Sequence, residues 1–348
     1  MTTSFNERAE VLRQRYAQLK ADQPKARIRK LAQDMGVSEL ELVAANCGDI
    51  QSTLLREPAQ EIFKALGELG RVMALTRNEW AVHERHGEYQ DIRAGKTMGI
   101  VLGPDIDLRM FFSTWKSTWA VNDGGRLSIQ FFDAAGQAIH KVYVTDETNV
   151  SAYHALVQKF ADDTPVWPSI TPLDIKQDGS VVDQPDLLRS EWLAMTDTHQ
   201  FYGLLQRHKV SRLGALRHAG ADLAQELPND VAERMLQDVA AQDISFMCFV
   251  GNQGMIQIHS GPIKKLLRMG PWFNVLEPHF NLHLDTTAIV STWIVNKPTD
   301  DGWVTSMECY AENGDLIVQF FGARKPGVPE LSAWRDLLVG YCPVPLAA

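Results

Sequence analysis

The sequence predicts an α+β fold with an internal duplication, in which each copy begins with helices that pack on an antiparallel β-sheet. Three observations predict it. The same residues recur at a fixed spacing, helix-capping patterns open the copies, and β-rich runs joined by glycine-containing turns follow. With 348 residues the chain is long enough for about two domains of ordinary size.

The repeat has a constant offset of 174 positions (252 minus 78), which is half the length of the chain. Asn78 to Gly87 align with Asn252 to Gly261, and Ser117 to Trp119 align with Ser291 to Trp293. Between the copies lies a segment rich in proline and acidic residues, which is typical of a linker. We therefore predict a first repeat over residues 1–161, a linker over 162–186 and a second repeat over 187–348.

Local patterns predict where helices and strands lie in each copy. Ser4-x-x-Glu7 and Ser38-x-x-Glu41 are capping boxes that mark helix starts. Short turns that contain Gly136 and Gly314 join neighbouring β-rich runs, which predicts antiparallel pairing. The predicted strands include Arg126 to Phe132, His140 to Val144, Ala288 to Val295 and Leu316 to Phe321.

Composition limits the function classes. The formal net charge of −9 makes nucleic acid an improbable partner, and an anionic ligand would need a local basic cluster. The four cysteines have no CxxC spacing, which fits a reducing cytoplasm better than a metal site or a disulfide framework. No export signal or apolar run long enough to span a bilayer is visible, so we expect a soluble cytoplasmic protein without membrane insertion.

Common catalytic fingerprints are missing from the sequence. It contains no glycine-rich phosphate loop, no GxSxG nucleophile elbow and no HExxH pair. Ala32 to Ala45 resembles a helix-turn-helix, but its second helix carries Glu39 and Glu41 and no basic residue, so carboxylates would face phosphates. The corresponding helix of the second copy carries Arg212 and is more basic. We expect both helices to be structural.

The segment Thr196 to His208 offers a candidate ligand. At 100° per residue Phe201, Leu204 and Leu205 share a core-facing stripe, whereas His199 lies on the opposite face next to Gly203. Asp197 or Thr198 would cap the helix and place His199 in its first turn, where neutral imidazole is favoured. Neutral imidazole ligates metals, although a solvent-facing role is also open.

The C-terminal strand provides a second candidate surface. If Leu316, Val318 and Phe320 face the core, then Ile317, Gln319 and Phe321 face the other side. Arg324 and Lys325 follow at the end of the strand. An apolar floor with cations at its rim suits a flat amphiphile that carries carboxylates, and a solvated basic turn is the alternative.

These segments resemble the HemS/ChuS/PhuS family of cytoplasmic haem-utilisation proteins, also called haemin-degrading factors. The resemblance covers essentially the whole chain, including its duplication. Its most specific motifs are GPDIDLRMFFSTW at Gly103 to Trp115, THQFYGLLQRHKVSR at Thr198 to Arg212, and VNKPTDDGWVTS followed by QFFGARKPG near the C-terminus.

The resemblance implies one haem on the second copy, between a helix and the sheet. His199 matches the iron ligand of the family, and Arg109 matches an arginine that reaches the distal side, where it would take part in any catalysis. Lys297 and Arg324 would form a basic rim that meets the haem propionates. The other residues that the resemblance places around haem are Arg212, Met247, Phe249, Gln319 and Phe321.

The resemblance also implies a function in haem trafficking. The protein would accept haem from an inner-membrane haem ABC transporter and pass it to a haem oxygenase or another acceptor. Because one histidine leaves an iron position open, oxidative ring opening with iron release and an external reductant is also implied. The alternative is a haem-responsive regulatory protein that binds DNA through its helix-turn-helix-like segments.

Overall fold

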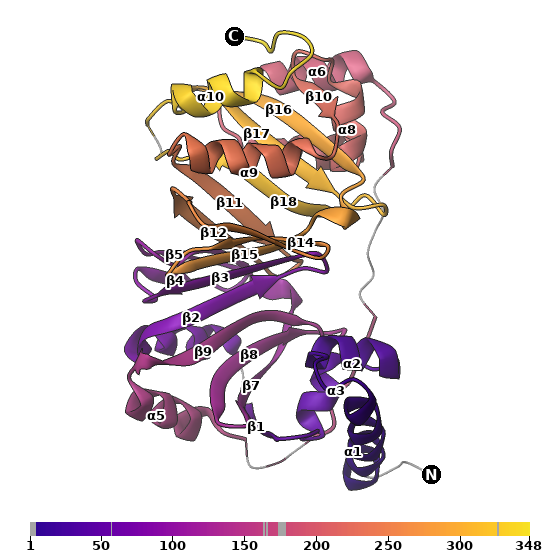
Figure 1. Cartoon of the computed structure of the whole chain (residues 1–348), viewed down its shortest axis with the longest axis vertical. Coiled ribbons are helices and arrows are strands. Elements are labelled where there is room, and N and C mark those ends of the chain that lie inside the picture. The colour runs from indigo at the N-terminus through magenta and orange to yellow at the C-terminus, as the bar shows by residue number, and fades with distance from the viewer. Residues whose placement is uncertain (1–4, 57, 163, 165, 173–178, 326) are drawn as a thin grey trace. The chain divides into compact units, whose positions relative to one another are not determined.

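The structure is a computed structural model that describes residues 5–56, 58–162, 164, 166–172, 179–325 and 327–348 (Figure 1). Two copies of one series of helices and strands follow each other along the chain, as the repeat predicts. The first series is α1 (Phe5–Asp22), α2 (Ile28–Met35), α3 (Glu39–Ala44), β1 (Ile50–Leu55), α4 (Ala59–Ala65), β2 (Gly70–Arg77), β3 (Ala81–Gly87), β4 (Ile92–Ala94), β5 (Met98–Leu102), β6 (Asp107–Phe111), β7 (Trp115–Asp123), β8 (Arg126–Asp133), β9 (Ala138–Thr148) and α5 (Val150–Phe160).

The second series repeats the first, element by element. It consists of α6 (Pro185–Leu193), α7 (Gln200–His208), α8 (Arg212–His218), β10 (Ala224–Leu227), α9 (Val231–Ala241), β11 (Phe246–Gly251), β12 (Met255–Gly261), β13 (Leu266–Met269), β14 (Trp272–Leu276), β15 (Phe280–Asp285), β16 (Ser291–Thr299), β17 (Gly302–Tyr310), β18 (Leu316–Gly322) and α10 (Ser332–Val339). Short 3-10 helices follow α4, β6 and β15 at Leu66–Leu69, Phe112–Thr114 and Thr286–Ala288.

The strand order is the same in both copies. Antiparallel neighbours run β1-β7-β8-β9-β2 in the first copy and β10-β16-β17-β18-β11 in the second. The register repeats as well, because Trp119 lies opposite Gln130 and its counterpart Trp293 lies opposite Glu308. The predicted antiparallel sheets and the internal duplication are therefore confirmed.

The chain divides into two compact units that exchange short segments. One unit contains Met1–Arg77, Glu84–Asp174 and Gly251–Gln257, and we call it unit 1. Unit 2 contains Asn78–His83, Ile175–Val250 and Ile258–Ala348. The change from one unit to the other falls within β3 and within β12, which are equivalent strands of the two copies. The boundaries at 161 and 187 stay a prediction, and the exchange of segments between the units was not predicted.

Equivalent asparagines fix the two exchanged turns. In unit 2 the Nδ2 of Asn78 donates to the carbonyl of Ile317 at 2.8 Å, and its Oδ1 accepts from two backbone N–H groups of its own turn. In unit 1 the Nδ2 of Asn252 donates to the carbonyls of Arg77 and Ile139 at 3.0 and 2.9 Å. The Oδ1 of Asn252 accepts from the backbone N–H groups that follow it, as the Oδ1 of Asn78 does.

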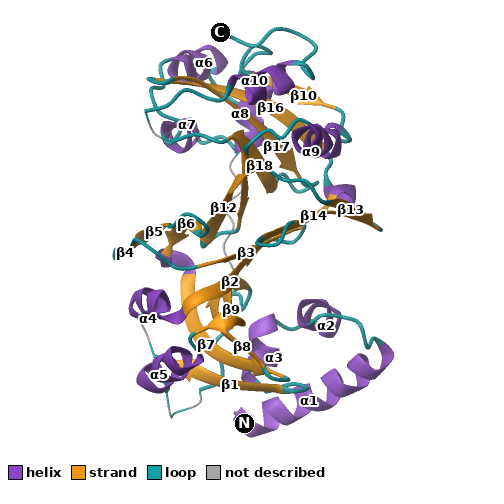
Figure 2. Ribbon diagram, turned by 60° about the vertical axis from the view of Figure 1, so that its left-hand side comes forward, coloured by secondary structure: helices purple, strands orange, loops and turns teal. Residues whose placement is uncertain are grey.

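The sheet of unit 2 carries helices on both faces (Figure 2), and a hydrophobic cluster lies on each face. Helices α9 and α10 pack on one face, where Phe246, Met307 and Phe320 are fully buried. Helices α6, α7 and α8 cover part of the other face, where Trp192 and Phe201 are buried. Most of the predicted ligand-binding residues lie on this second face of the sheet.

Several local predictions are confirmed and others need correction. Ser38 and Glu41 form the predicted capping box, whereas Ser4 of the other predicted box lies outside the described residues. The strand predicted from Ala288 begins only at Ser291, because a 3-10 helix occupies the preceding residues. Ile317 was predicted to face away from the core, but it is fully buried with Val318 in the α9/α10 cluster, because the pairing of β17 with β18 is irregular between Cys309 and Tyr310.

Two further findings bear on the expected linker and on membranes. Helix α6 begins at Pro185, so the last two residues of the predicted linker belong to a helix. Within the part of the chain that the structure describes, no helix is both long and apolar enough to cross a membrane.

The hydrogen bonds of Asn252 predict a large effect of its removal. Asn252→Ala leaves two carbonyls in part-buried positions and two turn N–H groups without their partner, so we expect a loss of about 2–3 kcal/mol in the free energy of unfolding. Asn313 makes comparable bonds at an exposed hairpin tip, and Asn313→Ala should cost less than about 1 kcal/mol. Urea denaturation of both variants measures the difference, and equal losses would contradict this role of Asn252.

Candidate functional site

The predicted haem-binding residues of the second copy all belong to unit 2. They come from the start of α7, the start of α8, the central strands and the turn after β18. These residues are His199, Arg212, Met247, Phe249, Lys297, Gln319, Phe321 and Arg324. Arg109 lies on β6 in unit 1.

His199 stands at the N-cap position of α7 with 89% of its side chain exposed. Its backbone N–H and its ring Nδ1 both contact Oδ1 of Asp197, at 2.8 and 2.6 Å. We expected Asp197 or Thr198 to cap the helix and His199 to lie in the first turn. Instead His199 precedes the helix and Asp197 bonds to it, because residues 197–201 form a tighter turn in which Gln200 N–H donates to the carbonyl of Asp197.

The helix behind His199 has the predicted two-sided character. Phe201, Leu204 and Leu205 are buried as the core stripe. On the other side Tyr202 is 71% exposed, and a Cβ atom at Gly203 would meet only the tip of the Arg207 side chain at 3.4 Å. The side of α7 that carries His199 is therefore open to a flat group.

A buried carboxylate, that of Glu308 on β17, organises the sheet next to α7. Oε1 and Oε2 of Glu308 accept from the guanidinium of Arg212 at 2.6 and 2.7 Å. Oε1 also accepts from Nζ of Lys297 at 3.1 Å and from Nε2 of Gln319 at 3.0 Å, and Oε2 accepts from the hydroxyl of Tyr310 at 2.5 Å. Three of the predicted ligand-binding residues thus converge on one carboxylate that the sequence analysis did not identify.

The charges of this Glu308 cluster do not cancel. Burial alone would raise the pKa of Glu308, but Arg212 and Lys297 hold that pKa well below its ordinary value, so the carboxyl group is ionised. Burial lowers the pKa of Lys297 to about 8 although Glu308 favours its charged form. At neutral pH two cations face one anion, which leaves one surplus positive charge.

Lys297 does not lie where it was expected. The resemblance placed it at an exposed basic rim, but only 3% of its side chain is accessible. Lys297 points at Glu308 from the neighbouring strand β16 and is covered by the ring of Phe201, whose centroid lies 4.6 Å from Nζ. The same ring lies 5.0 Å from the guanidinium carbon of Arg212. Helix α7 therefore packs directly on the Glu308 cluster.

Apolar side chains from β11 and β18 lie beside the cluster. Phe249 pairs with Gln319 across the two strands, and Met247 pairs with Phe321. The rings of Phe249 and Phe321 are 4.8 Å apart, and all four residues are only half-buried. They present a partly exposed apolar surface on the sheet face that carries Glu308.

Arg324 is tied to the segment that leads into α7. Its guanidinium bonds to Oδ2 of Asp301 at 3.2 Å in the turn between β16 and β17. The neighbouring Asp300 N–H donates to the carbonyl of Thr196 at 2.9 Å. Arg324 also lowers the pKa of Asp197, after the larger effect of the His199 bonds. His199 and Arg324 are thus held at the same end of the sheet.

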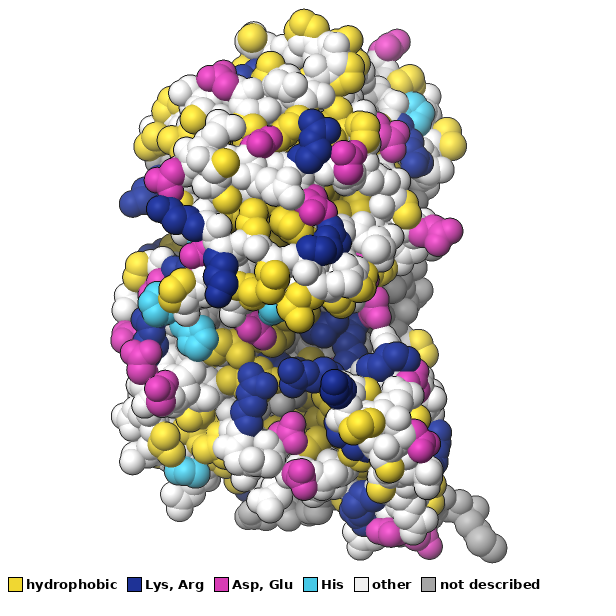
Figure 3. All heavy atoms as spheres, viewed as in Figure 1, with side chains coloured by type: hydrophobic (Ala, Val, Ile, Leu, Met, Phe, Trp, Pro, Cys, Tyr) yellow, Lys and Arg dark blue, Asp and Glu magenta, His cyan; other side chains and the backbone are white. Residues whose placement is uncertain are grey.

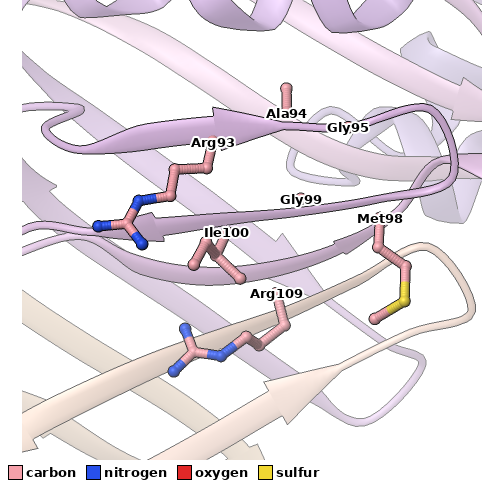
Figure 4. Close-up of a pocket in the computed structure, with 7 residues that line it drawn as sticks. All are labelled: Arg93, Ala94, Gly95, Met98, Gly99, Ile100 and Arg109. Atoms are coloured by element: carbon pink, nitrogen blue, oxygen red, sulfur yellow. The ribbon is translucent and has the colours of Figure 1, made fainter.

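Arg109 lines a pocket of about 440 Å³ in unit 1 (Figure 4). Arg93, Ile100 and Arg109 lie directly opposite one another on β4, β5 and β6, so their side chains share one face. Arg109 pairs with Asp107 of its own strand and donates to the carbonyl of Leu108 at 3.1 Å. Its assignment to the distal side of haem stays a prediction.

The first copy has different residues at the equivalent positions. Gln130 stands where Glu308 stands, Ala26 replaces His199, and Glu39 replaces Arg212. Glu39 is buried and pairs with Lys141, the counterpart of Gln319, so the expected structural role of this helix is borne out by its burial. Figure 3 shows further Lys and Arg side chains over α2 and the neighbouring ends of β8 and β9. This face of unit 1 is basic but has no histidine at the position of His199.

The described residues contain no group of three or more His, Cys, Asp or Glu side chains that could hold a metal ion together. A single protein ligand suffices only when the iron brings its other ligands with it, as a porphyrin does. An exposed imidazole, a half-buried apolar surface and a surplus cation fit a flat, partly apolar anion.

The charge of Glu308 carries a stability prediction. Glu308→Ala leaves the buried Lys297 and the half-buried Arg212 without their anion, and removal of one partner from a buried ion pair costs about 3–5 kcal/mol. Glu226 is an exposed glutamate of the same unit that accepts one bond from Ser291, and Glu226→Ala should cost about 1 kcal/mol or less. Urea denaturation measures the free energy of unfolding of both variants. A small loss in Glu308→Ala would show that the charges of Arg212 and Lys297 do not need Glu308 for stability.

Comparisons with known proteins bear on the whole chain. The family described as "Haemin-degrading HemS.ChuX domain" matches residues 36–160 and again residues 209–341. The hemin transport protein HmuS of Yersinia pestis is 39% identical over 330 residues, which are 93% of this chain and 95% of that protein. HemS of Yersinia enterocolitica is also 39% identical, over 328 residues and the same shares.

Solved structures agree with the sequence comparison. Holo-PhuS, a heme-binding protein from Pseudomonas aeruginosa, superposes with a TM-score of 0.92 at 40% identity, over 96% of this chain and 99% of that chain. The heme degrading enzyme ChuS of Escherichia coli O157:H7 superposes with a TM-score of 0.90 at 34% identity, over 96% and 100% of the two chains. With two family matches that repeat its own duplication, this chain belongs to the HemS/ChuS/PhuS family.

Proposed function

We propose that this protein binds one haem on its second copy and acts in haem transport, with His199 as the iron ligand. The observation that carries the proposal is the exposed imidazole of His199, two residues before Phe201, whose ring covers a cluster with one surplus positive charge. The relatives HmuS and HemS, called hemin transport proteins, and the heme-binding protein PhuS support the same ligand.

The residues of unit 2 divide the recognition of haem among them. His199 supplies a nitrogen to the iron, and Met247, Phe249 and Phe321 offer partly exposed apolar contacts to a porphyrin ring. Arg324 and the surplus charge of the Glu308 cluster favour the propionates. Haem brings iron held by four ring nitrogens, which explains why one histidine is enough.

The setting of this function is part of the same proposal. A haem carrier in the cytoplasm would receive haem from an inner-membrane ABC transporter and release it to an acceptor such as a haem oxygenase. An exposed ligand suits that task, because haem can enter and leave without unfolding of a core. Nucleic-acid binding through α3 is disfavoured, since Glu39, Leu40, Leu42, Val43 and Ala44 are all buried.

Haemin titration tests the proposal. Wild-type protein should bind one haemin per chain, and His199→Ala should shift the Soret band and release haem faster, because the only predicted iron ligand is gone. His279→Ala removes another exposed histidine of unit 2 and should leave both readouts unchanged. Unchanged spectrum and off-rate in His199→Ala would refute the proposal.

Oxidative opening of the porphyrin ring is a second candidate function. It is supported by the relative ChuS, two structures of which describe it as a heme degrading enzyme and as an E. coli heme oxygenase. Dioxygen would be the oxidant, an external donor would supply the electrons, and the products would include free iron and a linear tetrapyrrole. A single axial histidine is compatible with it, because the opposite iron position stays open.

Replacement of Arg109 tests oxidation of haem separately from binding of haem. If its guanidinium stabilises negative charge that develops on the oxygen, Arg109→Ala should retain haem but lose about 10²-fold in the rate of Soret loss with ascorbate in air. Arg93→Ala is the control: it removes another arginine that lines the same pocket, and it should leave the rate of Soret loss near that of the wild type. Catalase excludes attack by free peroxide. Equal rates of Soret loss in wild type and Arg109→Ala would indicate that Arg109 is a surface residue of β6 without a role in the oxidation.

A further inference from the structure

We propose that Asp197 is the positioning residue for the iron ligand: its carboxylate holds Nδ1 of His199 as a donor, so that Nε2 is presented to the haem iron. The inference rests on the proposed function of His199 and deepens it. It assigns to Asp197 a control over haem retention and over the electron density of the iron ligand, without contact to the haem itself.

The geometry makes Asp197 and His199 one unit. A single carboxylate oxygen, Oδ1, accepts the backbone N–H of His199 at 2.8 Å and contacts its ring Nδ1 at 2.6 Å. The first bond fixes the carboxylate relative to the backbone of His199. The second then fixes the rotation of the ring, which would otherwise be free because 89% of the His199 side chain is exposed.

The residues on both sides of this pair are anchored. Thr196 N–H donates to Oε1 of Gln200 at 3.0 Å, and Nε2 of Gln200 donates back to the Thr196 hydroxyl at 3.0 Å. The carbonyl of Thr196 accepts from Asp300 N–H at 2.9 Å in the turn between β16 and β17. The loop that holds Asp197 is therefore tied to α7 and to the sheet.

The charge of Asp197 determines which ring nitrogen stays available. The carboxyl group of Asp197 is 57% exposed, and an exposed aspartate is ionised at neutral pH, so it can only accept hydrogen bonds. Its contact with Nδ1 therefore requires a proton on Nδ1. A neutral ring with that proton carries its lone pair on Nε2, which is the atom left to bind a metal.

The first copy supports the pairing of the two roles. At the offset that aligns Ala26 with His199, Pro24 stands where Asp197 stands. The copy without the ligand therefore also lacks its carboxylate. A general role of this acid in helix capping would not require that coincidence, because α2 forms without a side-chain cap.

Stability alone does not account for Asp197. Its side chain is 57% exposed, and ion pairs between exposed groups contribute little to folding. In contrast, loss of a hydrogen-bond partner behind a metal-bound histidine typically costs about 10- to 100-fold in metal affinity. An effect on haem without an effect on unfolding is therefore the signature of this role.

The test compares Asp197→Asn and Asp197→Ala in the full chain loaded with haemin. Asparagine keeps the backbone bond and a neutral acceptor at Nδ1, whereas alanine removes both. We expect the haem off-rate to rise about 10-fold or more in Asp197→Ala and less in Asp197→Asn. Both variants should also raise the reduction potential of the bound iron, because a less electron-rich imidazole stabilises the ferric state less.

Two controls keep the result specific. Asp230→Asn changes an exposed aspartate at the N-cap of α9 in the same unit and should alter neither readout. In a His199→Ala background, Asp197→Ala should have no further effect on the off-rate, because the residue acts through His199. An additional loss in that background would overturn the proposal, as would wild-type off-rates and potentials in both single variants.

The two proposals fail differently. If His199→Ala leaves the Soret band unchanged, the iron ligand is wrong and the proposed function fails with it. If His199→Ala shifts the band while Asp197→Ala keeps the wild-type off-rate and potential, His199 is the ligand and the role of Asp197 alone is refuted. Unfolding midpoints that stay near wild type in Asp197→Ala confirm that the haem readouts do not report misfolding.

Discussion

The burial of one carboxylate, Glu308, is the constraint on which the second copy depends. A buried anion is tolerated only when it is paired and its lone pairs accept hydrogen bonds, and Glu308 meets both conditions through donors from α8, β16, β17 and β18. This requirement brings Arg212 and Lys297 together and gives Phe201 of α7 two cations to cover. The position of His199, two residues before Phe201, follows from that contact.

Duplication shows how the same fold supports different surfaces. In the second copy the helix supplies the cation and the strand the anion, whereas in the first copy Glu39 of the helix faces Lys141 of the strand. Each copy thus keeps a buried ion pair between its third helix and its sheet with the signs reversed. The second arrangement adds a second cation that is hydrogen-bonded to the anion, that of Lys297, and the second copy has His199 at the start of the preceding helix where the first copy has Ala26.

The sequence predicted features that depend on local patterns. Spacing along the chain was enough to predict four of them: the repeat offset, the antiparallel hairpins, the Ser38 capping box, and the buried stripe of Phe201, Leu204 and Leu205. The Glu308 cluster could not be derived in that way, because its partner Arg212 lies 96 positions away. Its only trace in the sequence is an acid in the middle of an apolar strand. Ile317 was misplaced because strict alternation does not survive a register irregularity.

The proposed site has a buried part, the Glu308 cluster, and an exposed part, His199. This division allows the site to be selective for an anion and still to release its ligand. The charges proposed to favour an anion are held by the buried carboxylate of Glu308, where their geometry is costly to change. The proposed iron ligand stands outside the core, and in the proposed arrangement its ring is oriented by one exposed hydrogen bond to the carboxylate of Asp197 rather than by packing. If His199 binds the iron as proposed, release of the ligand would require a local rearrangement at the start of α7 and no opening of either hydrophobic cluster of unit 2.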